Sequence, residues 1–141
     1  MPAVLKKVAY STAATAHGGR AGHVRSADGL VDFDLAQPGT TPEPAVNPET
    51  LFAAGYAACF QGALANRAKA LHDIDTSDSV VTATVSFGGT DDGGVGLAVD
   101  IEVSIPNVDQ QTAQQLVELA HQFCPYSKAT RDNIVVNVKA V

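Results

Sequence analysis

The two cysteines are the residues of this chain best suited to chemistry. Cys59 and Cys124 are the only cysteines among its 141 residues. In a reducing compartment a permanent structural disulfide is disfavoured, so such a pair is typically catalytic, redox-sensing or simply buried. In a catalytic pair, one thiolate attacks an oxidant and becomes a sulfenic acid, and the second thiol then condenses with it to form a disulfide.

The surroundings of each cysteine leave more than one interpretation open. Cys59 lies inside an apolar stretch, where a free cysteine usually serves as a small buried hydrophobe. The helix dipole fades after the first turn, so a nucleophilic Cys59 would need a cation from elsewhere in the fold. Cys124 follows a second predicted helix, whose negative end would raise the thiol pKa. Pro125 could instead open a new helical turn through Thr130, which would reverse that influence.

Arg20 and Glu49 are the candidate charged partners of a thiolate. Each also has an ordinary explanation, because Arg20 lies in a glycine-rich turn and Glu49 suits the start of a helix. A buried thiolate would nevertheless need a cation, and a buried arginine would need a carboxylate. Glu49 and Cys59 are ten residues apart on one predicted helix, which is about 15 Å along its axis. A shared site therefore requires Arg20 to bridge the gap or a second subunit to supply Glu49.

Other kinds of chemistry find little support in the sequence. The four histidines do not fall at metal-ligand spacing, and the glycine-rich stretches match neither Walker nor Rossmann spacing. The net charge of −6 argues against nucleic acid or an anionic membrane as a partner. No apolar signal region follows the first lysines, and the apolar stretch Leu51–Ala65 is too short to cross a bilayer. We therefore expect a soluble cytoplasmic protein without a bound metal or cofactor.

The elements that must position these residues predict an α+β chain. A helix, capped by Asn47, is expected to reach about Leu71, and because it is apolar nearly all round it should be central and buried. A second helix is expected over about Asp109–Phe123. We expect antiparallel sheets packed against these two main helices, in a single domain over residues 1–141. The strands are predicted over Leu5–Ala13, His23–Ser26, Leu30–Leu35, Val81–Phe87, Val95–Ile105 and Ile134–Val141. Apolar and polar residues alternate along Val95–Ile105, and we expect this strand to pair with Val81–Phe87 in a hairpin across the glycine-containing turn 90–94.

Four segments together resemble the organic hydroperoxide resistance family, within the superfamily of the osmotically inducible protein C. The first is GGRAG at 18–22 followed by SADG at 26–29, and the second is NPETLFAAGYAACF at 47–60. The others are AHQFCPYS at 120–127 and ATRDNI at 129–134. They occur in the family's order and at its expected separations, so the resemblance extends along the whole chain.

This resemblance implies a function and a set of roles. Cys59 would be the peroxidatic cysteine, Cys124 the resolving cysteine, and Arg20 and Glu49 the pair that activates the thiolate. The family fold is an intertwined homodimer with two active sites at the subunit interface. Its members reduce organic and lipid hydroperoxides with electrons from dithiols, notably protein-bound lipoyl groups, and they need no bound cofactor.

Some positions depart from the family pattern, and alternative functions remain open. Thr50 stands where glutamine is common, Asp132 stands where glycine is common, and the loop 36–48 is rich in proline. The run from Cys124 to Ser127 favours this branch over the sister branch of osmotically inducible peroxidases, which would have a different peroxide preference. A non-enzymatic redox sensor would oxidise stoichiometrically without turnover. A purely structural domain with inert thiols would not react quickly with peroxide at all.

Overall fold

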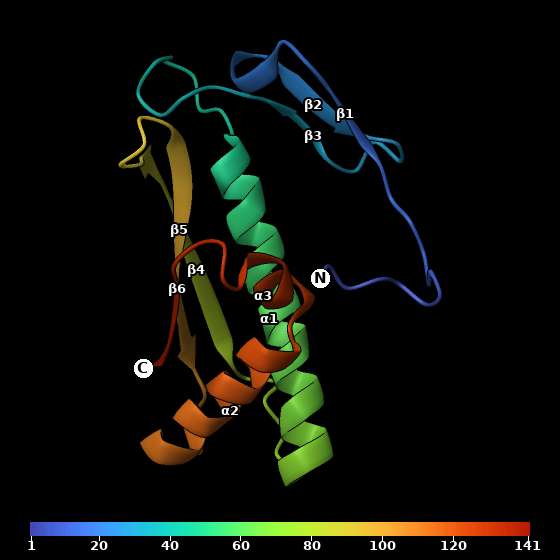
Figure 1. Ribbon diagram of the computed structural model, residues 1–141, viewed down its shortest axis with the longest axis vertical. Coiled ribbons are helices and arrows are strands. Elements are labelled where there is room, and N and C mark those ends of the chain that lie inside the picture. Colours follow the sequence, from blue (N-terminus) through green and yellow to red (C-terminus); the bar gives the residue numbers. More distant parts are fainter. The chain divides into compact units, whose positions relative to one another are not determined.

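A computed structural model describes residues 1–141, which divide into two compact units, 1–48 and 49–141. The α+β class expected from the sequence is confirmed, because each unit contains a three-stranded sheet and the chain forms helices α1 (Pro48–His72), α2 (Gln110–Phe123) and α3 (Pro125–Thr130) (Figure 1). No helix has both the length and the apolarity needed to span a membrane.

The first unit is built on an antiparallel sheet in the order β1-β2-β3. Tight turns connect its strands, and Gly22 lies so close to the chain that an added Cβ would meet the carbonyl oxygen of His17 at 1.8 Å. Only glycine fits at such an approach. A short 3-10 helix, η1 (Gly19–Ala21), carries Arg20 between the first two strands. The strands are β1 (Ala14–His17), β2 (His23–Ser26) and β3 (Asp32–Asp34).

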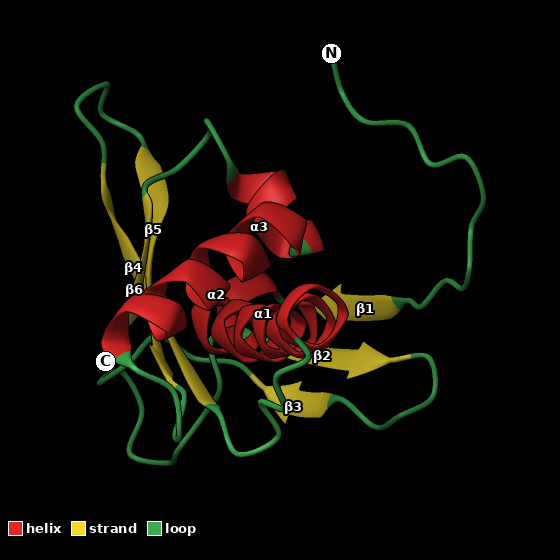
Figure 2. Ribbon diagram, turned by 90° about the horizontal axis from the view of Figure 1, so that it is seen from below, coloured by secondary structure: helices red, strands yellow, loops and turns green.

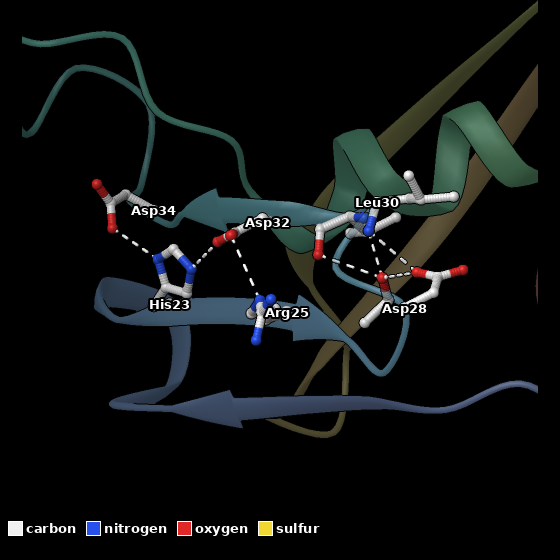
Figure 3. A network of polar contacts seen from close by, with 8 residues as sticks. His23, Arg25, Asp28, Leu30, Asp32 and Asp34 are labelled. Carbon is white, nitrogen blue, oxygen red and sulfur yellow. Dashed lines mark hydrogen bonds and ion pairs between the residues drawn. The ribbon is translucent and has the colours of Figure 1, made fainter.

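One face of this sheet carries a cluster of charged side chains (Figure 3). The ring of His23 lies between two carboxylates of β3, with Nδ1 2.8 Å from Asp34 Oδ1 and Nε2 in contact with Asp32 Oδ1. The hydrogen bonds with Asp34 and Asp32 raise the pKa of His23 above its ordinary value. Arg25 Nε lies 3.5 Å from Asp32 Oδ2. These contacts connect β2 to β3 across the exposed surface.

Two strands predicted in this unit are wrong or too long. No strand forms over Leu5–Ala13, because the four-residue β2 offers hydrogen-bond partners only from Ala14 onward. The strand predicted over Leu30–Leu35 shortens to β3. Its first residues are taken up by a turn in which the backbone N–H of Leu30 donates to Asp28 Oδ1 at 3.0 Å, and side chains of this kind compete with strand pairing.

Helix α1 begins at Pro48 and ends at His72, close to the bounds expected from the sequence. Its first turn contains an acid, Glu49, and its last turn contains Lys69 and His72, an arrangement that complements the helix dipole. One stripe of the helix is buried, comprising Tyr56, Phe60, Ala63, Leu64 and Ala68. Another stripe of small residues is exposed in the single chain, comprising Ala54, Ala58, Gly62 and Ala65.

The second unit packs its helices on one face of a mixed sheet, as Figure 2 shows. Strands β4 (Val80–Gly89) and β5 (Val95–Ser104) form the expected hairpin, and β6 (Val136–Ala140) lies on the other side of β5. Alternate residues of β5 point into the core, where Val99, Ile101 and Val103 are almost fully buried. This alternation confirms the half-buried strand that the period-two pattern predicts.

The pairing of β6 differs from the all-antiparallel arrangement that we expected. Strand β6 runs parallel to β5, with Ile101 opposite Val138 and Val103 opposite Ala140. The connection between the two strands passes through α2 and α3, and a long crossover of this kind is what parallel neighbours require. The two cysteine-bearing segments, α1 and the α2–α3 crossover, therefore lie on the same face of one sheet.

Candidate active site

The junction between α2 and α3 positions Cys124. The residue ends α2 and caps the start of α3, with an extended backbone (φ −62°, ψ 124°). Its N–H donates to the Ala120 carbonyl at 2.8 Å, and its own carbonyl accepts from the Lys128 N–H at 3.0 Å. Pro125 occupies the first turn of α3, where its fixed φ suits a helix start. Both helix ends considered from the sequence are therefore present at Cys124, the end of α2 and the start of a new helical turn.

The two sulfur atoms lie close together. Cys124 Sγ is 3.5 Å from Cys59 Sγ, although the residues are 65 positions apart in sequence. Both are free thiols; Cys59 is half-buried and Cys124 has no exposed surface. A disulfide has an S–S length of about 2.05 Å, so bond formation needs a closure of about 1.5 Å. The pair is thus placed for disulfide formation without a large rearrangement.

The groups around Cys59 do not by themselves activate its thiol. Burial is the largest influence and raises the pKa of Cys59 above its ordinary value. The backbone N–H of Tyr126 donates to the sulfur and lowers the pKa, whereas the neighbouring Cys124 raises it. The net direction is upward, so these groups leave Cys59 largely protonated at neutral pH. A nucleophilic Cys59 therefore needs a further positive group, as the sequence predicts.

Beside the sulfur pair, buried polar side chains connect the three helices. Tyr56 Oη of α1 lies 2.8 Å from Ser127 Oγ and 3.2 Å from Thr130 Oγ1, both of α3. Ser127 Oγ also lies 2.7 Å from His121 Nδ1 of α2. Burial and the nearby Arg131 lower the pKa of His121, so this ring is mostly neutral at physiological pH.

Aromatic side chains surround the other side of Tyr126. The rings of Phe52 and Tyr56 lie 6.2 Å and 5.7 Å from the Tyr126 ring, and an added Cβ at Gly55 would meet Tyr126 Oη at 3.0 Å. Next to them is a mainly apolar cavity of about 310 Å³. It is lined by Phe52, Leu97, Tyr126, Ala129, Thr130, Asn133 and Ile134.

The structure brings two of the four predicted site residues together. Cys59 and Cys124 are in contact, whereas Glu49 lies in the first turn of α1, ten residues from Cys59 and about 15 Å away along the axis. Arg20 belongs to η1 in the first unit. Both Arg20 and Glu49 have interaction partners. Their roles beside the thiolate stay predictions. No group of three or more histidine, cysteine or acidic side chains is arranged to hold a metal ion.

Sequence reasoning did not foresee the buried contacts of Tyr56, His121 and Ser127. In the sequence, Tyr56, His121 and Ser127 stood out only as members of the segments that carry the family resemblance. One signal was present, because a tyrosine inside an otherwise apolar helix must find a hydrogen-bond partner for its hydroxyl when it is buried. The sequence could not show which polar residue would supply that partner.

Comparisons with known proteins agree with this arrangement. Residues 39–139 match the family profile described as OsmC-like protein. The organic hydroperoxide resistance protein OhrB of Bacillus subtilis is 44% identical over 132 residues, which cover 92% of this chain and 96% of the relative. An organic hydroperoxide resistance protein of Xanthomonas axonopodis pv. citri is 44% identical over 137 residues, covering 94% and 95%.

Solved structures give the same picture. The crystal structure of OhrB from Bacillus subtilis superposes with a TM-score of 0.90 at 44% identity, covering 95% of this chain and 100% of that one. The crystal structure of an organic hydroperoxide resistance protein from Elizabethkingia anophelis superposes with a TM-score of 0.86 at 45% identity, covering 96% and 98%.

Proposed function

Because the chain belongs to the OsmC-like protein family, with organic hydroperoxide resistance proteins as its relatives, we propose that it reduces organic hydroperoxides to alcohols through Cys59 and Cys124. The family resemblance noted in the sequence is confirmed, and the chain is a peroxidase-type enzyme with a role in hydroperoxide detoxification. The observation that carries the cysteine mechanism is the 3.5 Å separation of the two sulfurs, in a chain that has only two cysteines.

In the first step, the Cys59 thiolate attacks the terminal oxygen of the hydroperoxide. The O–O bond breaks, the sulfur becomes a sulfenic acid, and the departing alkoxide takes up a proton to become the alcohol. The local groups raise the pKa of Cys59, so we assign Arg20 the task of stabilising the thiolate and the charge on the leaving oxygen. Glu49 would hold that arginine in place.

In the second step, Cys124 condenses with the sulfenic acid. The S–S bond forms and water leaves. An external dithiol then reopens the disulfide by two successive thiol exchanges and is itself oxidised to a disulfide. Because Cys124 is fully buried and Cys59 is half-buried, the external thiol should attack the sulfur of Cys59. A lipoyl group on a carrier protein in the cytoplasm is the dithiol that we propose, and no resident cofactor takes part.

The apolar surroundings support an organic substrate over hydrogen peroxide. The cavity beside Tyr126 has a volume of about 310 Å³ and a mainly apolar lining. Tyr126 supplies both part of this lining and the N–H that donates to Cys59. A hydrocarbon chain that filled the cavity would gain about 25 cal/mol for each square ångström removed from water. A small polar peroxide would gain nothing there.

We also propose that the working form is a homodimer of a single domain over residues 1–141. The axial separation of about 15 Å keeps Glu49 from reaching Cys59 of its own helix, so a second copy is a plausible source of one of the charged groups. The exposed stripe of small residues on α1, which includes Ala58 and Gly62, would also permit close helix packing against a partner. Two-fold symmetry is the commonest way to supply such cover.

A turnover assay tests the proposed function. With an organic hydroperoxide and dihydrolipoamide, the wild-type protein should consume many equivalents of peroxide, and a monothiol should support less turnover. Cys59→Ser should consume none. Cys124→Ser should consume about one equivalent and then stall as the sulfenic acid, because its resolving thiol is gone.

Three outcomes would contradict the proposal in different ways. Stoichiometric oxidation of the wild type without turnover would indicate a redox sensor. Faster turnover with hydrogen peroxide than with an organic hydroperoxide would favour the sister branch. Equal multiple turnover by both cysteine variants would show that the assigned roles are wrong.

A further inference from the structure

We infer that Tyr56, Ser127 and His121 act as positioning residues for disulfide closure, by holding the start of α3 against α1 so that Cys124 reaches the oxidised Cys59 quickly. We call these three side chains, together with Thr130, the hydroxyl chain. The inference rests on the proposed function, because it concerns the second step of that cycle. It assigns a role to buried polar groups that the first step does not use.

The hydroxyl chain lies one helical turn from the sulfurs on both sides of the site. Tyr56 precedes Cys59 by three residues on α1, and Ser127 follows Cys124 by three residues at the start of α3. Residues three apart lie next to each other on one face of a helix. The hydrogen bond from Tyr56 to Ser127, 2.8 Å long, and the sulfur pair, 3.5 Å apart, therefore connect the same two segments as neighbouring cross-links.

The hydrogen bonds of the hydroxyl chain can all run in one direction and end on a backbone carbonyl. If His121 carries its proton on Nδ1, it donates to Ser127, Ser127 donates to Tyr56, and Tyr56 donates to Thr130. Thr130 Oγ1 then donates to the backbone carbonyl of Ser127 at 3.2 Å, so every hydroxyl donates once and accepts once. Tyr56 and Ser127 have no exposed surface, so loss of any one link leaves a buried hydroxyl with only one of its two partners.

Closure of the disulfide is the step most sensitive to how firmly the hydroxyl chain holds α3 against α1. The sulfurs must approach by about 1.5 Å, and Cys124 has no exposed surface through which it could swing freely. The backbone N–H that donates to Cys59 belongs to Tyr126, between Cys124 and Ser127. A loose α3 would lengthen the time that Cys59 spends as a sulfenic acid. A second hydroperoxide molecule would then oxidise it to the sulfinic acid and be reduced to the alcohol.

The test measures how Cys59 is partitioned between disulfide and sulfinic acid. The protein is treated with increasing excess of an organic hydroperoxide without reductant, and both products are quantified by mass spectrometry. In Tyr56→Phe and Ser127→Ala, closure should slow about tenfold, which is the effect of one buried hydrogen bond, and sulfinic acid should appear at about tenfold lower peroxide. The double variant should be less severe than the two single effects combined, because both substitutions break the Tyr56–Ser127 link.

Conservative and control variants separate positioning from general loss of stability. His121→Asn should retain wild-type partitioning, since its side-chain amide can reach Ser127, whereas His121→Leu should behave like Ser127→Ala. Ser79→Ala removes another buried hydroxyl, which accepts from Gln61 of α1 at 3.3 Å. It lies outside the hydroxyl chain and should leave the partition unchanged.

Failure of the inference and failure of the proposed function give different results. If folded Tyr56→Phe and His121→Leu close the disulfide at the wild-type rate, the inference is wrong although the function stands. The inference is equally wrong if Ser79→Ala shifts the partition as far as Ser127→Ala does. If the wild type itself forms neither disulfide nor sulfinic acid with an organic hydroperoxide, the proposed function fails. Tyr56→Phe keeps the aromatic ring and its packing, so this variant decides the question even where Ser127→Ala does not fold.

Discussion

Removal of the Arg20 guanidinium should raise the pKa of Cys59, because a cation beside the sulfur favours the thiolate. The groups of the second unit already hold that pKa above its ordinary value of 9.0, and a thiol with a pKa of about 9 is roughly 1% ionised at pH 7. A guanidinium about 4 Å from the sulfur contributes about 4 kcal/mol at an effective dielectric constant of 20. An interaction of that size would lower the pKa of Cys59 and raise its thiolate fraction at neutral pH.

The expected kinetic result in Arg20→Ala is a loss of at least about a hundredfold in the rate of the first oxidation at pH 7. The fall in thiolate fraction accounts for a loss of this size. The less acidic thiolate is intrinsically more nucleophilic, which returns part of the loss. The departing alkoxide also loses its stabilising cation, an effect worth roughly 10²–10³ for one donor in other enzymes. The third effect is larger than the second, so we expect the net loss to be at least the hundredfold that ionisation alone gives.

The assay follows thiolate absorbance against pH in a Cys124→Ser background, where Cys59 is the only thiol. Arg20→Lys should keep part of the pKa depression, because it keeps the charge but loses the planar fork. Arg25→Ala is the matched control. It removes another arginine of the first unit, whose Nε lies 3.5 Å from Asp32 Oδ2, and should leave the Cys59 titration unchanged.

Two results would refute this reasoning. One is an unchanged Cys59 pKa in folded Arg20→Ala, which would remove arginine from the mechanism. The other is an oxidation rate in Arg20→Ala that stays low and flat as the pH rises toward 10. A rate limited by ionisation should increase tenfold with each pH unit until the thiol is fully ionised.

Two further predictions concern the assembly and the first unit. Mixed dimers of Cys59→Ser and Glu49→Ala chains should regain activity if each site contains residues of both chains, because half of the mixed sites then hold an intact Cys59 and Glu49 together. Verified mixed dimers that recover no activity, or a monomer in sedimentation, would contradict the shared site. Because the pKa of His23 is raised in the folded protein, its protonated ring stabilises the β2–β3 pairing. This stabilisation is complete below about pH 6.5, the pKa of histidine in the unfolded chain, and it is lost as the pH rises through the higher pKa of the folded protein. Hydrogen exchange of the β2 and β3 amides should therefore gain protection at low pH in the wild type but not in His23→Gln, once the intrinsic pH dependence of exchange is subtracted.

The elements with strong local signals were predictable from the sequence. The helix that carries Cys59 was expected from Asn47, Pro48 and Glu49, because capping and dipole chemistry act within one turn. The β4–β5 hairpin was expected from alternating apolar residues on either side of a glycine-rich turn. The strand predicted over Leu5–Ala13 failed because a strand needs a partner, and the short β2 provides none for those residues.

The geometry of the site depended on contacts that local signals do not encode. The partnership of Cys59 with Cys124 followed from the family resemblance, and only the fold places the sulfurs 3.5 Å apart. The parallel pairing of β6 depends on how the α2–α3 crossover packs, which no periodicity specifies. The same crossover brings Ser127 to Tyr56. Each of these residues had a sufficient local explanation, as a core aromatic or a helix-start serine, so nothing in the sequence linked them.

The parallel pairing of β5 with β6 also has a consequence for the newly synthesised chain. Helix α1 and the β4–β5 hairpin form from residues that are close in sequence, whereas β6 can join the sheet only after the ribosome has made α2 and α3. Non-local pairing of this kind pays its loop-closure entropy before it gains contacts, and so it forms late. Cys59 therefore exists on a formed helix before Cys124 is locked beside it. If the two cysteines have the roles proposed above, the nascent chain would hold its nucleophile without its resolving thiol during that interval, and its sulfenic acid would be open to further oxidation.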